Sequence, residues 1–200
     1  MGSVASTLGW YKGMDDKYKA VRVIGIDPSK TSTGIVVLEA YYKPYEVLTW
    51  CQRTISSPVS GLEGCVSQVE DLIGIIREFK PTFGVIENYA FGNRYSLATL
   101  VELGTCFRLA LRSCGVKYAE VAPSSLKKFA TGNGRSKKVD IADKVLEQWQ
   151  FESKSDDIVD AYVLARIGLA VKGFGDLNKA QNEVTTMVRA KLNEGNTRKR

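Results

Sequence analysis

Two short apolar segments that each end in an acidic residue place the strongest constraint on the fold of this chain. Residues 21–26 are β-branched and largely apolar, a pattern typical of a strand buried in the centre of a sheet, and Asp27 follows directly. Residues 83–86 form a second segment of this kind, which leads into Glu87. Ligands bind at the carboxyl ends of strands in open α/β sheets. If the two strands are neighbours, their carboxylates would therefore lie within reach of one cation.

A second acidic group begins the last helix expected in the core, from Ser155 to about Val171. Asp157 and Asp160 are three residues apart on one helical face, where like charges repel unless a cation lies between them. The residues that follow are apolar, so this face is expected to turn inward, where an unpaired carboxylate is costly. The helix dipole alone is a sufficient reason for an acid in the first turn, such as Asp156. Spacing does not choose between Asp156 and Asp157, because Asp156 and Asp160 are four apart.

The composition narrows the chemistry of such an acidic cluster. Lys and Arg outnumber Asp and Glu by 28 to 22, for a net charge of +6, which favours a polyanionic partner. The chain has no histidine, so Ser-His and Cys-His pairs and a histidine general base are excluded. A metal site would have to be built from oxygen, which suits Mg²⁺ or Mn²⁺. Acids in a basic chain indicate divalent cations acting on a polyanion, and hence nucleic-acid cleavage.

The four cysteines and the hydropathy pattern exclude other classes of protein. No two cysteines have CxxC spacing, which with the absence of histidine argues against a zinc finger and favours reduced thiols in a cytoplasmic protein. No apolar stretch approaches the roughly 20 residues that span a bilayer. Gly2 and Ser6 fit the loose pattern for N-myristoylation, but a flexible leader is the simpler interpretation of residues 1–20.

The order of elements predicts an α/β fold with a mixed central sheet and flanking helices. Strands are expected at 21–26, 34–38, 45–53, 83–86 and 116–121. Helices are expected at 62–79 and 96–112, followed by one that starts at 123, one that ends at 149, and one at 155–171. The first three strands read as an antiparallel meander. Residues 173–200 are expected to form a polar, basic C-terminal tail.

The predicted helix at 96–112 is apolar around most of its circumference. Its apolar residues cannot all face one core: Leu97, Leu100, Val101, Leu103, Phe107, Leu109 and Leu111. The helix is therefore either buried centrally or placed at an interface between subunits. Gly104 would permit close approach of a neighbour.

Three segments in order resemble RuvC, the Holliday-junction resolvase family of the ribonuclease-H-like superfamily. They are residues 23–29, 85–88 and 157–161, and the resemblance covers roughly residues 21 to 170. It implies a ribonuclease-H-like fold, a nuclease domain over 21–172, and a homodimer formed through the helix at 96–112. It also implies a metal site with two Mg²⁺ or Mn²⁺ ions held by Asp27, Glu87, Asp157 and Asp160, with Asp157 preferred over Asp156.

The same resemblance assigns roles to a basic segment and to an aromatic residue. Lys127 and Lys138 match two functionally important lysines of the family, and phosphate contact is expected for the basic set Lys127, Lys128, Arg135, Lys137 and Lys138. If the chain lacked the acidic residues, the simplest interpretation of these lysines would be a solvent-exposed charged face. The family has an aromatic residue after the second acid that engages the bases of the junction. Tyr89 or Phe91 would fill that role here, with Phe91 preferred.

The expected function is therefore a metal-dependent endonuclease that resolves four-way DNA junctions by paired symmetric nicks, acting in the cytoplasm of a bacterial or phage-infected cell. Three alternatives stay open from the residues. The first is a flap, branched-DNA or ribonuclease-H-type nuclease of the same superfamily, and the second is a protein that binds junctions without cutting them. The third is an actin-like kinase, because residues 25–29 with Thr33 and Gly34 resemble the first phosphate loop of that fold. A helicase partner cannot be named from the sequence.

Overall fold

The central element is a five-stranded mixed sheet. The computed structural model describes residues 20–30, 32–42, 45–59, 61–88 and 94–197. The strands are β1 (Val21–Asp27), β2 (Thr33–Tyr42), β3 (Tyr45–Ile55), β4 (Phe83–Glu87) and β5 (Lys117–Val121), in the spatial order β3-β2-β1-β4-β5. The meander β1-β2-β3 is antiparallel, whereas β1, β4 and β5 are parallel. The mixed sheet expected from the sequence is confirmed.

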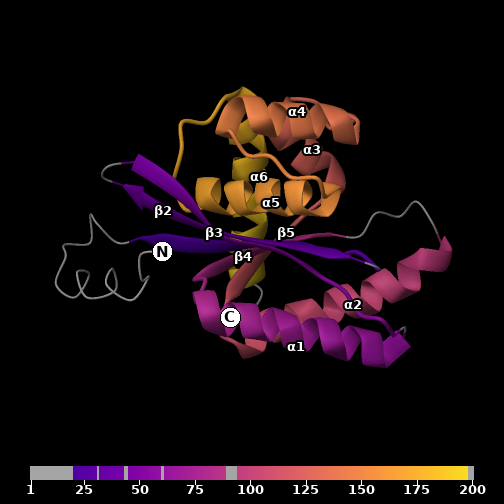
Figure 1. Cartoon of the computed structure of the whole chain (residues 1–200). Helices are drawn as coiled ribbons and strands as arrows, with labels where there is room; N and C mark the ends of the chain where they lie inside the picture. The colour runs from indigo at the N-terminus through magenta and orange to yellow at the C-terminus, as the bar shows by residue number, and fades with distance from the viewer. Residues whose placement is uncertain (1–19, 31, 43–44, 60, 89–93, 198–200) are drawn as a thin grey trace, which may run out of the picture.

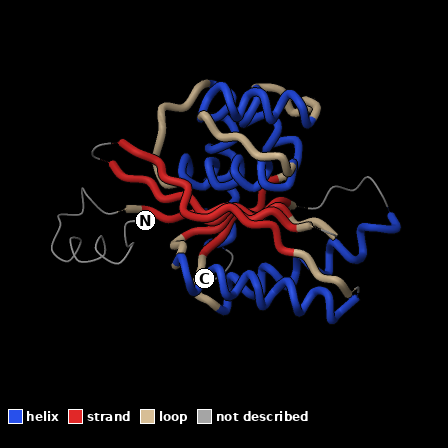
Figure 2. Tube along the Cα trace, viewed as in Figure 1, coloured by secondary structure: helices blue, strands red, loops and turns tan. Residues whose placement is uncertain are grey.

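Helices cover both faces of this sheet (Figure 1). Helices α1 (Gly61–Phe79) and α2 (Arg94–Ser113) lie on one face, and α3 (Pro123–Thr131), α4 (Lys138–Trp149) and α5 (Asp156–Val171) lie on the other. Figure 2 shows the strands as a layer between the two groups of helices. Each face has its own apolar core, with Ile24 and Ile26 directed to the α1–α2 side and Val23 to the α5 side. No helix within the described ranges is long and apolar enough to cross a membrane.

Helix α5 lies directly on the sheet because two strand residues have no side chain. A Cβ atom added at Gly25 would lie 2.0 Å from the carbonyl oxygen of Ala161, and one added at Gly34 would lie 2.0 Å from that of Asp157. Glycine within a strand often marks such a close backbone approach. The first turns of α5 are therefore pressed against β1 and β2.

The segment expected as a polar tail contains a helix, α6 (Lys179–Thr197), so that expectation is corrected over these residues. Val184 and Val188 are buried in the core on the α5 side, and α6 contacts α3, α5 and β5. A capping box starts the helix: the Asn178 side chain accepts from the backbone N–H of Gln181, and the Gln181 side chain accepts from that of Asn178. The expected leader, except Ala20, lies outside the described residues.

Helix α2 has two apolar faces in the structure. Leu103, Phe107 and Leu111 are buried against the sheet, which is one of the two outcomes expected. Leu109, however, is 61% exposed and Val101 is 38% exposed. One face of α2 is thus used within the chain, and the other is open.

Candidate active site

The four predicted acids come from three elements that meet at one edge of the sheet. Asp27 is the last residue of β1 and Glu87 the last of β4, and these strands are adjacent and parallel, with Ile26 paired to Ile86. Their carboxylates therefore emerge side by side at the carboxyl edge. The close packing of α5 on β1 and β2 brings Asp157 and Asp160 to the same place.

Burial and neighbouring negative charges raise the pKa values of Asp27, Glu87 and Asp160. The pKa of Asp27, which is only 9% exposed, lies well above the ordinary value because of burial, a hydrogen bond with the Glu87 side chain, and the negative charges of Glu87 and Asp157. Burial, followed by the charge of Asp160, raises the pKa of Glu87. Burial and the charge of Asp27 raise the pKa of Asp160 to about 7. The charges of Glu87 and Asp157 thus make Asp27 harder to ionise, and the charge of Asp27 does the same to Asp160, as expected for carboxylates that share one site. The hydrogen bond with Asp27, by contrast, lowers the pKa of Glu87.

Lys127 and Lys138 lie beside this cluster. The positive charge of Lys127 lowers the pKa of Glu87, and that of Lys138 lowers the pKa values of Asp27, Glu87 and Asp160. These opposing contributions are smaller than the effect of burial, so the pKa values of the acids stay raised. The structure therefore brings together all six residues that the sequence predicts as catalytic.

Asp156 has a partner of its own. Its Oδ2 atom lies 3.4 Å from Nζ of Lys138, and both side chains are largely exposed. Partial burial lowers the pKa of Lys138, but the charges of Asp156, Asp160 and Asp157 outweigh it and raise that pKa. Asp156 thus pairs with the lysine, a contact that sequence spacing could not reveal.

The acids fit a hard divalent cation by the chemistry of their donors. All four supply carboxylate oxygens, the ligands that Mg²⁺ and Mn²⁺ prefer. Among the described residues, no three acidic or cysteine side chains yet converge at the spacing of ligands to one ion. The charges of Glu87 and Asp157 raise the pKa of Asp27, the charge of Asp27 raises the pKa of Asp160, and a bound cation would remove this repulsion.

The rest of the predicted basic set is dispersed. Lys128 turns to α6, where its Nζ atom lies 2.6 Å from Oε2 of Glu183. Arg135 and Lys137 are exposed, in the loop before α4 and at its N-terminal cap. The two aromatic candidates, Tyr89 and Phe91, lie outside the described residues.

This chain is similar to proteins of one family. Residues 23–168 match the profile of the family described as crossover junction endodeoxyribonuclease RuvC. The curated RuvC of Synechococcus sp. (strain WH7803) is 28% identical over 152 residues, covering 74% of this chain and 97% of that protein. The RuvC of Prochlorococcus marinus (strain AS9601) is 26% identical over 157 residues, covering 77% of this chain and 99% of the relative.

A solved structure shows the same fold. The structure of T. thermophilus RuvC in complex with a Holliday junction substrate superposes with a TM-score of 0.63 at 20% identity, covering 72% of this chain and 90% of that one. Because the family profile matches residues 23–168, which is most of the chain, this chain belongs to the RuvC family of crossover junction endodeoxyribonucleases.

Proposed function

We propose that Asp27, Glu87, Asp157 and Asp160, with Lys127 and Lys138, are the apparatus with which this member of the RuvC family resolves four-way DNA junctions. The observation that carries the proposal is the electrostatic coupling of these acids at one sheet edge, with both lysines acting on them. Perturbed pKa values concentrated in one place are typical of catalytic sites. Family membership favours this activity over the kinase interpretation.

Nucleases of this family are metal-dependent, and we assign Mg²⁺ or Mn²⁺, two ions per site, to the four carboxylates. When bound, two such ions supply an activated water and stabilise the departing 3′ oxygen. The acids hold and orient that centre, and because the chain has no histidine, no imidazole shares in activating the water. Lys127 and Lys138 would offset negative charge on the phosphate being cut, which accumulates as the bond breaks.

DNA contact outside the centre is assigned to the other residues of the predicted basic set. Lys128, Arg135 and Lys137 lie on α3 and in the loop and cap that lead into α4, close in sequence to the catalytic lysines. Their charges would bind backbone phosphates, so affinity should fall steeply as salt rises. Stacking of Phe91 or Tyr89 on a base stays a prediction.

A homodimer is part of this proposal. Exposed apolar residues of α1 and α2 include Leu62, Val66, Val101 and Leu109. Between the two helices runs a groove of about 630 Å³ that is lined largely by apolar side chains, including Val69 and Ile73. A second copy would cover this face, and its two-fold axis would match the symmetry of a four-way junction. We assign the protein to the cytoplasm, where its DNA would be found and where free cysteines stay reduced.

Mapping of nick positions on a synthetic four-way junction tests the activity. With Mg²⁺ we expect paired nicks at symmetric positions on two strands, and far slower cutting of linear duplex, flap and RNA–DNA hybrid. Preferred cutting of flaps would support a broader branched-DNA nuclease instead. Tight junction binding that is indifferent to Mg²⁺, with no cutting, would overturn the assignment.

The variant Asp27→Asn tests the metal site. We expect cleavage to fall by at least about 10³-fold while junction binding persists, because the amide removes a negative ligand but keeps the shape of the side chain. Asp71→Asn is the matched control, since Asp71 is exposed on α1. Normal turnover by Asp27→Asn would contradict the assignment.

A further inference from the structure

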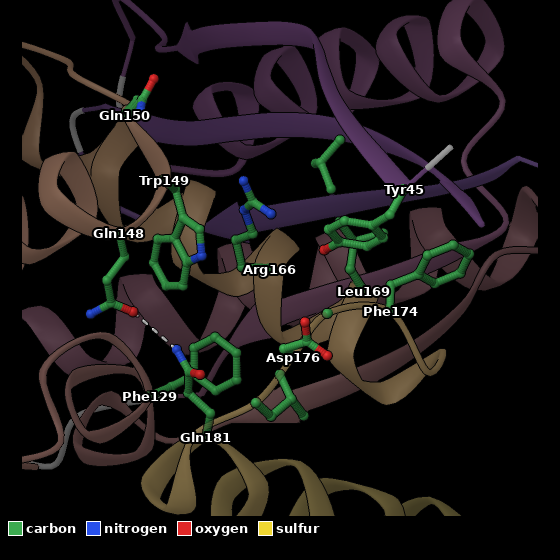
Figure 3. Close-up of a pocket in the computed structure, with 13 residues that line it drawn as sticks. Tyr45, Phe129, Gln148, Trp149, Gln150, Arg166, Leu169, Phe174, Asp176 and Gln181 are labelled. Carbon is green, nitrogen blue, oxygen red and sulfur yellow. Dashed lines mark hydrogen bonds between the residues drawn. The ribbon is translucent and has the colours of Figure 1, made fainter. Parts of the chain in front are cut away.

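A cavity of about 650 Å³ lies on the α4–α6 side of the sheet (Figure 3). Its walls come from the C-terminal end of α4, the second half of α5, the start of β3 and the segment that leads into α6. None of the six candidate catalytic residues lines it. Its volume is in the range of small-molecule sites.

Aromatic rings give the cavity flat walls. Trp149 and Phe129 stack on one another with ring centroids 6.2 Å apart and an interplanar angle of 23°. Tyr45 and Phe174 stand on the other side of the view in Figure 3. Phe129 and Phe174 are almost wholly buried, so the rings open to a flat aromatic ligand are those of Trp149 and Tyr45.

Arg166 is held in a fixed orientation at this cavity. Its Nε and Nη2 atoms both donate to the hydroxyl of Tyr162, at 2.9 Å and 2.6 Å, and its guanidinium carbon lies 5.3 Å from the centroid of the Trp149 ring. It is the only basic residue of α5, which is otherwise almost wholly buried. Its Nη1 atom has no hydrogen-bond partner among the described residues. A preorganised donor is thus available to a ligand at little cost in entropy.

Two more polar groups of the cavity are available. Across the described chain, neither the indole N–H of Trp149 nor the carboxylate of Asp176 makes a hydrogen bond or ion pair, and Figure 3 shows Arg166 and Asp176 entering the cavity from different elements. The side-chain amides of Gln148 and Gln181 are already hydrogen-bonded to each other. Gln148 accepts from Nε2 of Gln181 at 3.1 Å and donates to the carbonyl of Ala130 at 2.8 Å, so its side chain is already satisfied. Arg166, the indole N–H of Trp149 and the carboxylate of Asp176 therefore supply two donors and one acidic acceptor, beside the Tyr45 hydroxyl and the Gln150 amide, which also line the cavity.

We propose that this cavity binds a guanine base. Guanine offers the acceptors O6 and N7 to an arginine. Its neighbouring donors, N1–H and the N2 amino group, match the two oxygens of one carboxylate. In the cavity, O6 and N7 would face Arg166 and the indole N–H of Trp149, the donor edge would face Asp176, and the ring would stack on the aromatic walls.

Adenine fits this arrangement poorly. It places an amino group where guanine has O6, so that group would face the donors of Arg166, and it has no N2 amino group for Asp176. A site whose polar groups are left unpaired by the wrong ligand rejects that ligand strongly. The base could belong to a free nucleotide or to an unpaired position in branched DNA. The inference does not rest on the nuclease assignment.

Titration of the ¹⁵N-labelled full chain with GMP, AMP and CMP, in Mg²⁺-free buffer, tests the inference. Cleavage plays no part in this readout. We expect GMP to shift the Trp149 indole resonance saturably and at least about tenfold more tightly than AMP or CMP, since each lost bidentate pair is worth that much. The resonance is assigned as the one absent from Trp149→Phe. Oligonucleotides with one unpaired G or one unpaired A distinguish a base in DNA from a free nucleotide.

Asp176→Asn and Asp143→Asn complete the test. Asp176→Asn keeps the size of the side chain but replaces one acceptor with a donor, so guanine affinity should fall at least about tenfold with an unchanged melting temperature. Asp143 is exposed on α4 and does not line the cavity, so Asp143→Asn should bind as the parent does. Absence of a saturable shift with both GMP and the unpaired-G oligonucleotide would overturn the inference. Equal affinity for guanine and adenine, or unchanged binding by Asp176→Asn, would do so as well.

Discussion

At the scale of a single residue, Asp160 of the proposed metal site should lower the stability of the fold when no cation is bound. Burial and the charge of Asp27 raise its pKa to about 7, whereas an aspartate in an unfolded chain titrates near about 3.9. The folded state therefore holds its proton where the unfolded state has released it. Without a cation, the free energy of unfolding should fall as pH rises from about 4 to about 7, and be lowest above that range.

Asp160→Asn should therefore stabilise the metal-free protein. Removing the buried charge should raise the free energy of unfolding by about 1–3 kcal/mol at pH 8, an amount set by the size of the pKa shift and reduced by solvent screening. The gain should shrink at pH 5, where Asp160 of the parent is mostly protonated. Thermal melts at both pH values, with and without Mg²⁺, measure this. Mg²⁺ should raise the melting temperature of the parent more than that of the variant, and a variant less stable than the parent at pH 8 would refute the argument.

The contact between Asp156 and Lys138 is exposed, so we expect it to affect cleavage more than stability. The 3.4 Å ion pair should contribute little to stability, but it holds the ammonium beside the acids. We expect Asp156→Asn to slow cleavage by only about 2–5-fold, corresponding to the modest energy of an exposed pair. In a Lys138→Ala background the same change should have no further effect. Cleavage kinetics of the four proteins in this cycle measure the coupling, and a loss as large as that of Asp27→Asn would instead make Asp156 a metal ligand.

At the scale of elements, the position of the acids depends on how closely α5 approaches the sheet. Gly34→Ala would add a Cβ atom 2.0 Å from the backbone oxygen of Asp157, so the first turn of α5 must shift. We expect a loss of at least about 2 kcal/mol in the free energy of unfolding. Cleavage should also fall in the fraction that stays folded, because Asp157 and Asp160 move away from Asp27.

Gly74→Ala provides the matched control for this prediction. Gly74 lies inside α1 with no atom within 4 Å of an added Cβ, so alanine should stabilise the helix by about 0.5–1 kcal/mol and leave cleavage unchanged. Chemical denaturation and cleavage rates of both variants give the comparison. Equal effects of the two substitutions would show that contact with α5 is not what constrains Gly34.

These elements also show what the sequence could predict and why. The strands before Asp27 and Glu87 and the helix that carries Asp157 and Asp160 have local apolar patterns, so their existence and their acids could be predicted. The direct contact of Gly34 with α5 joins residues more than a hundred positions apart, and no local pattern reports it. The only sequence signal was a glycine inside a strand.

Helix α6, by contrast, could have been predicted, because its sequence signals are local. Asn178 and Gln181 have capping-box spacing, and Val184 and Val188 follow at helical spacing. Most of the other residues of α6 are polar, which gave the segment the composition of a tail. The Lys128–Glu183 pair could not be predicted, because it depends on where α6 packs.

At the scale of the whole molecule, the two faces of the sheet have different outer surfaces. On the α1–α2 face, the exposed apolar side chains Val66 and Leu109 line one groove, whereas Val139 and Leu146, exposed on α4, do not line the cavity on the other face. A patch of this kind commonly marks a protein–protein interface. A single protomer has one set of the proposed catalytic acids, and cutting two strands of one junction symmetrically requires two.

Leu109→Asp should therefore produce a folded monomer that has lost paired nicking. Leu109 is 61% exposed, so the substitution should cost little stability in the protomer, but it would place a charge at the centre of the proposed interface. Light scattering after size exclusion should report the mass of two chains for the parent and of one for the variant. On a cruciform plasmid, the parent should linearise the DNA, whereas the variant should give at most single nicks. Met187→Asp, at a 39% exposed apolar residue of α6, is the control and should remain dimeric. A dimer that survives Leu109→Asp would move the interface away from the α1–α2 face.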